Sequence, residues 1–172
     1  LTAALLIVFV WPYLIDGYPF GVGPDVPVYL WWTRIGASEG LSMVGSRPGA
    51  PALAAALAGT LQLNVTAVTA GLASALGVAT GVAAAALVRA AGSRTAPTWM
   101  LAGLLAGVFS VHLVAGYLAN LILAVCFLAA AAALAGPTRA WWAAGLLLAG
   151  GGIAHPPFLV HAIVVLLVTA IL

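Results

Sequence analysis

Three carboxylates are the side chains of this sequence with the clearest capacity for chemistry. Asp16, Asp25 and Glu39 are its only acids, and they fall within one short stretch. A carboxylate can bind a metal ion or act as a general base. Each acid also has a structural explanation, because Asp25 can cap a following helix, Asp16 can mark the end of an apolar helix, and Glu39 can pair with Arg34 or face water. The residues alone leave these alternatives open.

Histidines form the second group of candidates. His112, His155 and His161 all lie in or beside apolar runs. Such a histidine is more often a packing or interfacial residue than a ligand, but an ionisable residue deep in an apolar segment is a functional candidate. The single cysteine, Cys126, excludes a disulfide framework and a cysteine-based metal site.

The composition indicates which class of protein carries these residues. The chain has 172 residues, of which 65% are hydrophobic and 5% charged, and its net charge is +2. A soluble domain carries roughly a quarter charged residues, and disordered chains are poor in apolar ones. We therefore expect a multi-pass integral membrane protein of the cell membrane with no nucleic-acid partner. Both ends lie inside apolar runs, so residues 1–172 are expected to be the transmembrane domain of a longer chain.

Arginines predict the topology. Arg89, Arg94 and Arg139 lie in or beside two short polar breaks, and short arginine-rich loops stay cytoplasmic. About 40 residues separate the breaks, enough for two spans of roughly 20 residues each, with a turn near residues 115–117. Residues 65–91 form the preceding span, which starts after Asn64 as its N-cap, and residues 1–15 are the end of a first span.

The last part of the chain is less uniform. Residues 141–154 are expected to run outward until His155-Pro156-Pro157 breaks the helix. Residues 158–172 then form either a returning span or the second half of a kinked one. Gly77 with Gly81, and Gly103 with Gly107, have the small-xxx-small spacing that lets helix backbones approach closely, most simply within one chain.

The segment 16–50 is predicted to be an extracytoplasmic first loop. It is rich in glycine and proline up to Asp25, after which an aromatic, amphipathic pattern predicts a helix lying on the outer membrane surface. Residues 51–63 are too short to span and predict an interfacial or re-entrant helix. The expected fold is all-α, a polytopic helical bundle of five to six spans without a sheet.

The first loop resembles that of known enzymes. The runs Tyr18-Pro19-Phe20-Gly21, Gly23-Pro24-Asp25 and Tyr29-Leu30-Trp31, with Gly40-Leu41-Ser42 and Arg47-Pro48-Gly49, are similar to loops of bacterial, actinobacterial-type members of the GT-C superfamily. These multi-spanning glycosyltransferases use polyprenyl-phosphate sugars. The resemblance covers about 35 residues plus the expected topology, and it corresponds to the N-terminal half of such an enzyme.

The resemblance implies a function and a site. It implies transfer of a sugar from a polyprenyl-phosphate donor on the outer face of a bacterial inner membrane, with membrane lipid and the rest of the chain, or a membrane complex, as partners. Asp25 or Asp16 would be the catalytic base and hold a divalent metal, Mg²⁺ or Mn²⁺. Several families of this superfamily have two adjacent acidic residues, and this sequence lacks such a pair. The other groups on the outer side are candidates for substrate binding: Arg34, Arg47, His112 and His155.

Two other classes of function fit the same residues. A transporter would use the histidines along a pathway and the His-Pro-Pro break as a discontinuous helix. Because the acids lie in one outer loop rather than at mid-membrane, the enzyme is favoured over the transporter. A non-catalytic subunit of a membrane complex, with the outer loop as a docking surface, is not distinguished from the enzyme by the sequence.

Overall fold

The computed structural model describes residues 1–18, 23–41, 44–45, 47–110 and 117–171, and this part of the chain is helical, with no strand. The helices are α1 (Thr2–Asp16), α2 (Val26–Glu39), α3 (Gly49–Leu61), α4 (Val65–Ala90), α5 (Ala96–Phe109), α7 (Leu118–Ala135), α8 (Trp141–Ala154) and α9 (Pro156–Ile171). The expectation of an all-α fold is confirmed for the described residues.

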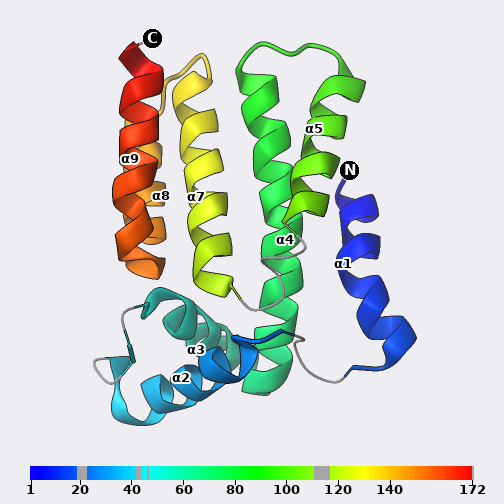
Figure 1. The fold of residues 1–172 in the computed structure, drawn as a ribbon, viewed down its shortest axis with the longest axis vertical. Coiled ribbons are helices and arrows are strands. Elements are labelled where there is room, and N and C mark those ends of the chain that lie inside the picture. The colour runs from blue at the N-terminus through cyan, green and yellow to red at the C-terminus, as the bar shows by residue number, and fades with distance from the viewer. Residues whose placement is uncertain (19–22, 42–43, 46, 111–116, 172) are drawn as a thin grey trace.

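Six helices stand side by side and two lie across one end. In Figure 1, α1, α4, α5, α7, α8 and α9 run roughly along the vertical axis, whereas α2 and α3 cover the lower end of α4 and α7. The α4–α5 and α7–α8 connections both lie at the upper end. A groove lined by Arg89, Trp99 and Pro137 brings these two connections together. The arginines of the two breaks therefore share one end, as the sequence predicts, opposite α2 and α3.

Two of these helices are long and apolar enough to cross a membrane. They are α4, with 26 residues, and α7, with 18. At 1.5 Å per residue, they extend over about 39 Å and about 27 Å. The other upright helices have 14 to 16 residues each. They extend over about 21–24 Å, less than the roughly 30 Å of a hydrocarbon core. Five to six spans therefore stays a prediction.

Local signals place the helix boundaries. The side chain of Asn64 accepts a hydrogen bond of 2.8 Å from the Thr66 N–H, which makes Asn64 the N-cap of α4, as predicted. Just before it, Gln62 has a left-handed backbone with φ 55°, so α3 ends there and remains a separate helix. Proline at the start of α9 ends the ladder of α8, and His155 is the residue between the two helices.

The α8–α9 pair settles one of the open alternatives. The end of α9 lies at the upper end of the molecule, near the α7–α8 connection, and α9 runs antiparallel to α8 (Figure 1). Residues 156–171 therefore form a returning helix, not the second half of a kinked one. The result places His155 at the lower end, near α3.

The glycine pairs pack α1 against α4 and α5. A Cβ atom on Gly77 would lie 2.5 Å from the Phe9 ring, and one on Gly107 would lie 2.3 Å from the Leu5 side chain. Gly81 and Gly103 face each other, since a Cβ on either would lie 2.7 Å from the other's carbonyl oxygen. Close packing within one chain, predicted from the small-xxx-small spacing, is confirmed.

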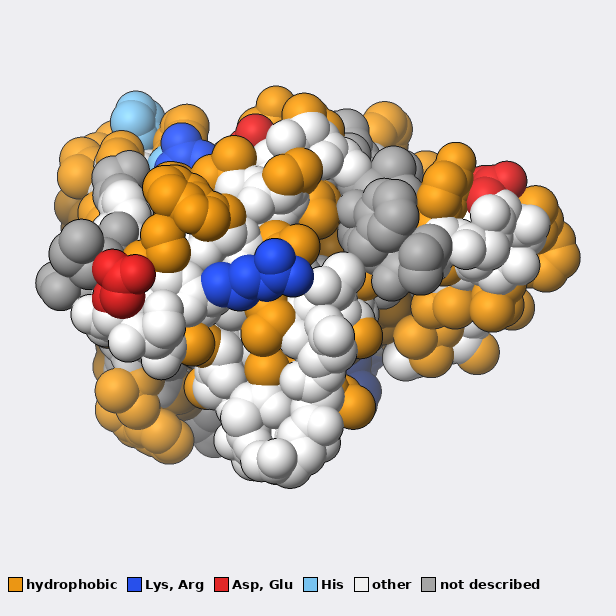
Figure 2. All heavy atoms as spheres, turned by 90° about the horizontal axis from the view of Figure 1, so that it is seen from below, with side chains coloured by type: hydrophobic (Ala, Val, Ile, Leu, Met, Phe, Trp, Pro, Cys, Tyr) orange, Lys and Arg blue, Asp and Glu red, His pale blue; other side chains and the backbone are white. Residues whose placement is uncertain are grey.

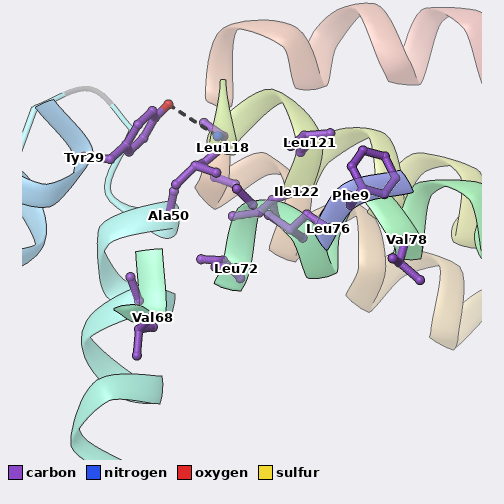
Figure 3. Close-up of a cluster of buried hydrophobic side chains, with 14 of the residues drawn as sticks. Phe9, Tyr29, Ala50, Val68, Leu72, Leu76, Val78, Leu118, Leu121 and Ile122 are labelled. Atoms are coloured by element: carbon purple, nitrogen blue, oxygen red, sulfur yellow. Dashed lines mark hydrogen bonds between the residues drawn. The ribbon is translucent and has the colours of Figure 1, made fainter. Parts of the chain in front are cut away.

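The core continues from these helices to the lower end. Buried side chains of α1, α3, α4 and α7 form one cluster, which Tyr29 of α2 joins at 2% exposure (Figure 3). The Tyr29 hydroxyl accepts a hydrogen bond of 3.3 Å from the N–H of Ala119, in the first turn of α7. That N–H has no acceptor within its own helix, so Tyr29 caps α7 from another helix. Its contact fixes α2 across the end of the bundle.

Candidate functional site at the end covered by α2 and α3

The lower end of the bundle carries the polar side chains of the first loop. Figure 2 views this end, and acidic, basic and histidine side chains show there among hydrophobic side chains and backbone. The helix α2 buries Val26, Tyr29 and Thr33 and exposes both Trp31 and Arg34. Its exposed side therefore mixes apolar and charged residues, and the predicted polar and apolar faces are not cleanly separated.

Asp25 occupies the N-cap position of α2 without capping it. Its carbonyl accepts the backbone N–H of Tyr29 at 3.0 Å, but its side chain makes no capping hydrogen bond. Pro27 stands at the second helical position and has no N–H to donate. The backbone at Asp25 is also helical, with φ −91° and ψ −8°, rather than extended as a capping residue usually is. The expected cap is wrong, and the half-buried carboxylate stays available for another role.

Three other charged candidates, Asp16, Arg34 and Glu39, are exposed. Asp16 is the last residue of α1, seven positions after Phe9, the last buried residue of that helix. Arg34 and Glu39 lie on α2, and within the described residues no ion pair joins them. Both face solvent, which is one of the two structural explanations given to them.

A metal site needs more ligands than the described residues bring together. The described part contains no group of three or more histidine, cysteine, aspartate and glutamate side chains placed to hold a metal ion. Mg²⁺ is commonly bound by one or two carboxylates together with substrate phosphates and water. Asp25 or Asp16 fits a metal only in that mode, in which the substrate supplies most of the ligands.

The structure brings Arg47 and His155 together. His155 lies in the connection between α8 and α9 and is 1% exposed. Burial lowers its pKa, and the positive charge of Arg47 lowers that pKa further. Arg47 is half-buried in the segment just before α3. Among the described residues, no carboxylate contributes to the His155 shift, so this pair is separate from Asp16, Asp25 and Glu39.

Neither ring nitrogen of His155 has a hydrogen-bond partner in the described structure, and Asn120 Oδ1 is also buried without one. The two residues lie at the same level of the bundle. A Cβ on Gly151 would lie 3.5 Å from the Cα of Leu123, and the helices α7 and α8 run antiparallel. Asn120 precedes Leu123 by one turn and His155 follows Gly151 by one turn. Buried polar groups are nearly always partnered, by protein or by ordered water, so these exceptions make His155 and Asn120 candidates for contact with a water or a ligand.

The start of α3 lies against the residue before His155. A Cβ atom on Gly49 would lie 2.6 Å from the Cα of Ala154, so only glycine allows this approach. The N-cap of α3 is Pro48, which makes no side-chain cap hydrogen bond. Because Pro51 has no N–H, the free donors of this first turn are those of Gly49 and Ala50. They bring the positive end of a helix beside Arg47 and His155.

The remaining histidines differ from His155. His112 lies outside the described residues, so its predicted role stays a prediction. His161 is exposed on α9, with Nδ1 3.3 Å from the Pro157 carbonyl oxygen. The Phe158 ring lies between the two histidines, 4.5 Å from the His155 ring and 5.5 Å from the His161 ring. His161 is therefore held by its own helix rather than by the site.

Sequence reasoning missed Asn120, and it placed Tyr29 and Gly49 in the outer loop without predicting their contacts with α7 and Ala154. Asn120 is the only amide in the apolar run of residues 118–135, a signal that the sequence does contain. No known protein family, no curated protein and no solved structure matches the chain. The candidate site is therefore identified from its geometry alone.

Proposed function

We propose that the protein is a multi-pass membrane protein whose six upright helices lie across the bilayer, with α2 and α3 at its outer surface. The support is the apolar exterior: large hydrophobic side chains are exposed along α1, α5, α8 and α9, including Ile7, Leu101, Leu146 and Val164. Trp141 and Trp142, both exposed at the start of α8, suit the inner interface. Shorter helices are accommodated by local thinning of the bilayer.

We further propose that this end of the bundle transfers a sugar from a polyprenyl-phosphate donor, as the resemblance of the first loop to GT-C glycosyltransferases implies. One observation supports the proposal most directly. A half-buried carboxylate with no capping role, an arginine and a buried unpartnered histidine all occur at the end of the bundle opposite Arg89, Arg94 and Arg139. That is the end at which a lipid headgroup would enter.

The chemistry requires a base and a cation. Asp25, or Asp16, takes the proton of the acceptor hydroxyl as its oxygen attacks the anomeric carbon. The bond between that carbon and the phosphate oxygen breaks, and the electron pair leaves on the lipid phosphate. Arg34 and Arg47 offset this developing negative charge. A divalent metal held by the acid, Mg²⁺ or Mn²⁺, would stabilise the same charge when bound.

The test uses the full-length protein in membranes, with a polyprenyl-phosphate sugar carrying a radiolabel. Asp25→Asn is expected to lower the transfer rate by roughly 10²–10⁴-fold while the protein remains folded, since a general base contributes about that factor. If Asp16 is the base, the loss appears in Asp16→Asn instead. Glu39→Gln, an exposed acid at the far end of α2, is the matched control and should keep full activity.

Retention of full activity in both aspartate variants refutes the catalytic assignment. No transfer by the wild-type protein, combined with its co-purification in a stoichiometric membrane complex, favours the non-catalytic subunit. Accumulation of a solute by proteoliposomes, lost in His155→Gln, favours the transporter.

A further inference from the structure

In the connection between α8 and α9, a buried polar side chain has no hydrogen-bond partner in the described protein, and a positive charge acts on it. His155 is buried with both ring nitrogens unpartnered, and Arg47 is the charged side chain that acts on it. A buried polar group without a partner is costly, as is an arginine next to the positive end of a helix. An anion placed among these groups would relieve both costs.

Three kinds of donor lie in this region, where the start of α3 packs against Ala154. Arg47 supplies a guanidinium, which pairs with phosphate oxygens in a bidentate manner. The first turn of α3 supplies the N–H groups of Gly49 and Ala50, left without a side-chain cap by Pro48. His155 supplies a ring N–H, and the absence of a side chain at Gly49 lets α3 lie directly against the backbone of Ala154. A cation would be repelled here, and an apolar ligand would leave the donors unsatisfied.

We propose that Arg47, His155 and the first turn of α3 bind one phosphate group. The inference deepens the proposed function, on which it rests for the identity of the ligand, because it assigns the phosphate of the lipid-linked donor to this site rather than to Arg34. When phosphate binds, a protonated His155 donates one N–H to a phosphate oxygen. Asn120 Oδ1, the other unpartnered buried side-chain atom in the described part, lies at the same level of the bundle.

The experiment measures binding by the full-length protein purified in nanodiscs. The probe is farnesyl phosphate, a short isoprenoid phosphate monoester, and farnesol, which lacks the phosphate, is the ligand control. Arg47→Gln should weaken farnesyl phosphate binding about 10- to 100-fold, the range for loss of a charge-assisted hydrogen bond, and leave farnesol binding unchanged. Arg94→Gln, which removes an exposed arginine from the opposite end, should bind farnesyl phosphate like the wild type.

A second pair of variants tests the part of α3. Gly49→Ala would move α3 away from Ala154 and weaken farnesyl phosphate binding, whereas Gly59→Ala in the same helix, where a Cβ meets nothing within 4 Å, should not. This pair keeps the test decisive if His155→Gln fails to fold. Competition by millimolar inorganic phosphate would identify free phosphate as the ligand, and lack of competition would identify the lipid headgroup; both outcomes support a phosphate site.

Equal farnesyl phosphate binding by Arg47→Gln, Arg94→Gln and the wild-type protein overturns the proposal, as does equal binding by Gly49→Ala and Gly59→Ala. Sugar transfer measured on the same preparations separates this result from failure of the proposed function. If Arg47→Gln binds normally while Asp25→Asn or Asp16→Asn loses transfer, the phosphate site is wrong and the glycosyltransferase stands. If Arg47→Gln loses phosphate binding but no variant affects transfer, the site stands and the catalytic proposal is wrong.

Discussion

The contact between α4 and α5 makes a quantitative prediction about Gly81. A Cβ atom there would lie 2.6 Å from the Leu5 side chain and 2.7 Å from the Gly103 carbonyl oxygen. Alanine at Gly81 must therefore push two helix backbones apart. Overpacking of this kind costs about 1–3 kcal/mol. The same substitution gains about 0.5–1 kcal/mol, because alanine is a better helix former than glycine.

Gly71 provides the matched control. It lies in the same helix, and a Cβ atom there meets nothing within 4 Å. Gly71→Ala should therefore show only the gain in helix propensity. Subtracting one variant from the other cancels that gain, so Gly81→Ala should be less stable than Gly71→Ala by about 1–3 kcal/mol.

The measurement is reversible unfolding of the full-length protein in mixed micelles, with the denaturing detergent as the variable and circular dichroism as the signal. A double-mutant cycle with Leu5→Ala separates the two contacts. Coupling of about 0.5–3 kcal/mol between the Leu5 and Gly81 substitutions would assign the cost to that side chain. Equal stability of Gly81→Ala and Gly71→Ala would refute the close packing of these helices.

Three further predictions concern other parts of the molecule. Tyr29→Phe removes the hydroxyl that caps α7 and should lower the free energy of unfolding by about 0.5–1.5 kcal/mol, measured in the same assay. Because burial and Arg47 lower the pKa of His155, the unfolded chain binds its proton first, so stability should fall as pH drops below about 6.5; His155→Gln should flatten this dependence and His161→Gln should not. After replacement of the native cysteine, cysteines at Ser93 and Ser38 should react with an impermeant reagent from opposite sides of the membrane, and labelling of both from one side would contradict the topology.

The features predicted well from the sequence depend on neighbouring residues. Asn64 caps the helix that follows it, and His155-Pro156-Pro157 breaks one, because capping and proline act within a single turn. The glycine pairs correctly predicted close helix contacts, because their spacing places both glycines on one face of the helix. Asp25 shows how such reasoning fails, since Pro27 removes one of the two donors that a cap can use and the backbone at Asp25 is helical rather than extended.

The features that were missed depend on residues far apart in the chain. Tyr29 bonds to Ala119 across 90 positions. Arg47 meets His155 across a still longer separation. No local pattern encodes such pairs, because they arise from how α2 and α3 lie across the bundle. The number of membrane spans is hard to predict for a different reason. The short upright helices are shorter than the length expected of a membrane-crossing helix.

The position of α1 also bears on how the protein is made. Leu5 and Phe9 fit against glycines of α4 and α5, the last of which, Gly107, is synthesised about 100 residues after Leu5. At a synthesis rate of ~5–20 residues per second, roughly 5–20 s pass between the synthesis of Leu5 and that of Gly107. During that time the apolar surface of α1 depends on lipid or an insertion chaperone for cover. Because α1 packs against residues that are synthesised well after it, a separately expressed α1 peptide should dock onto a chain that lacks it.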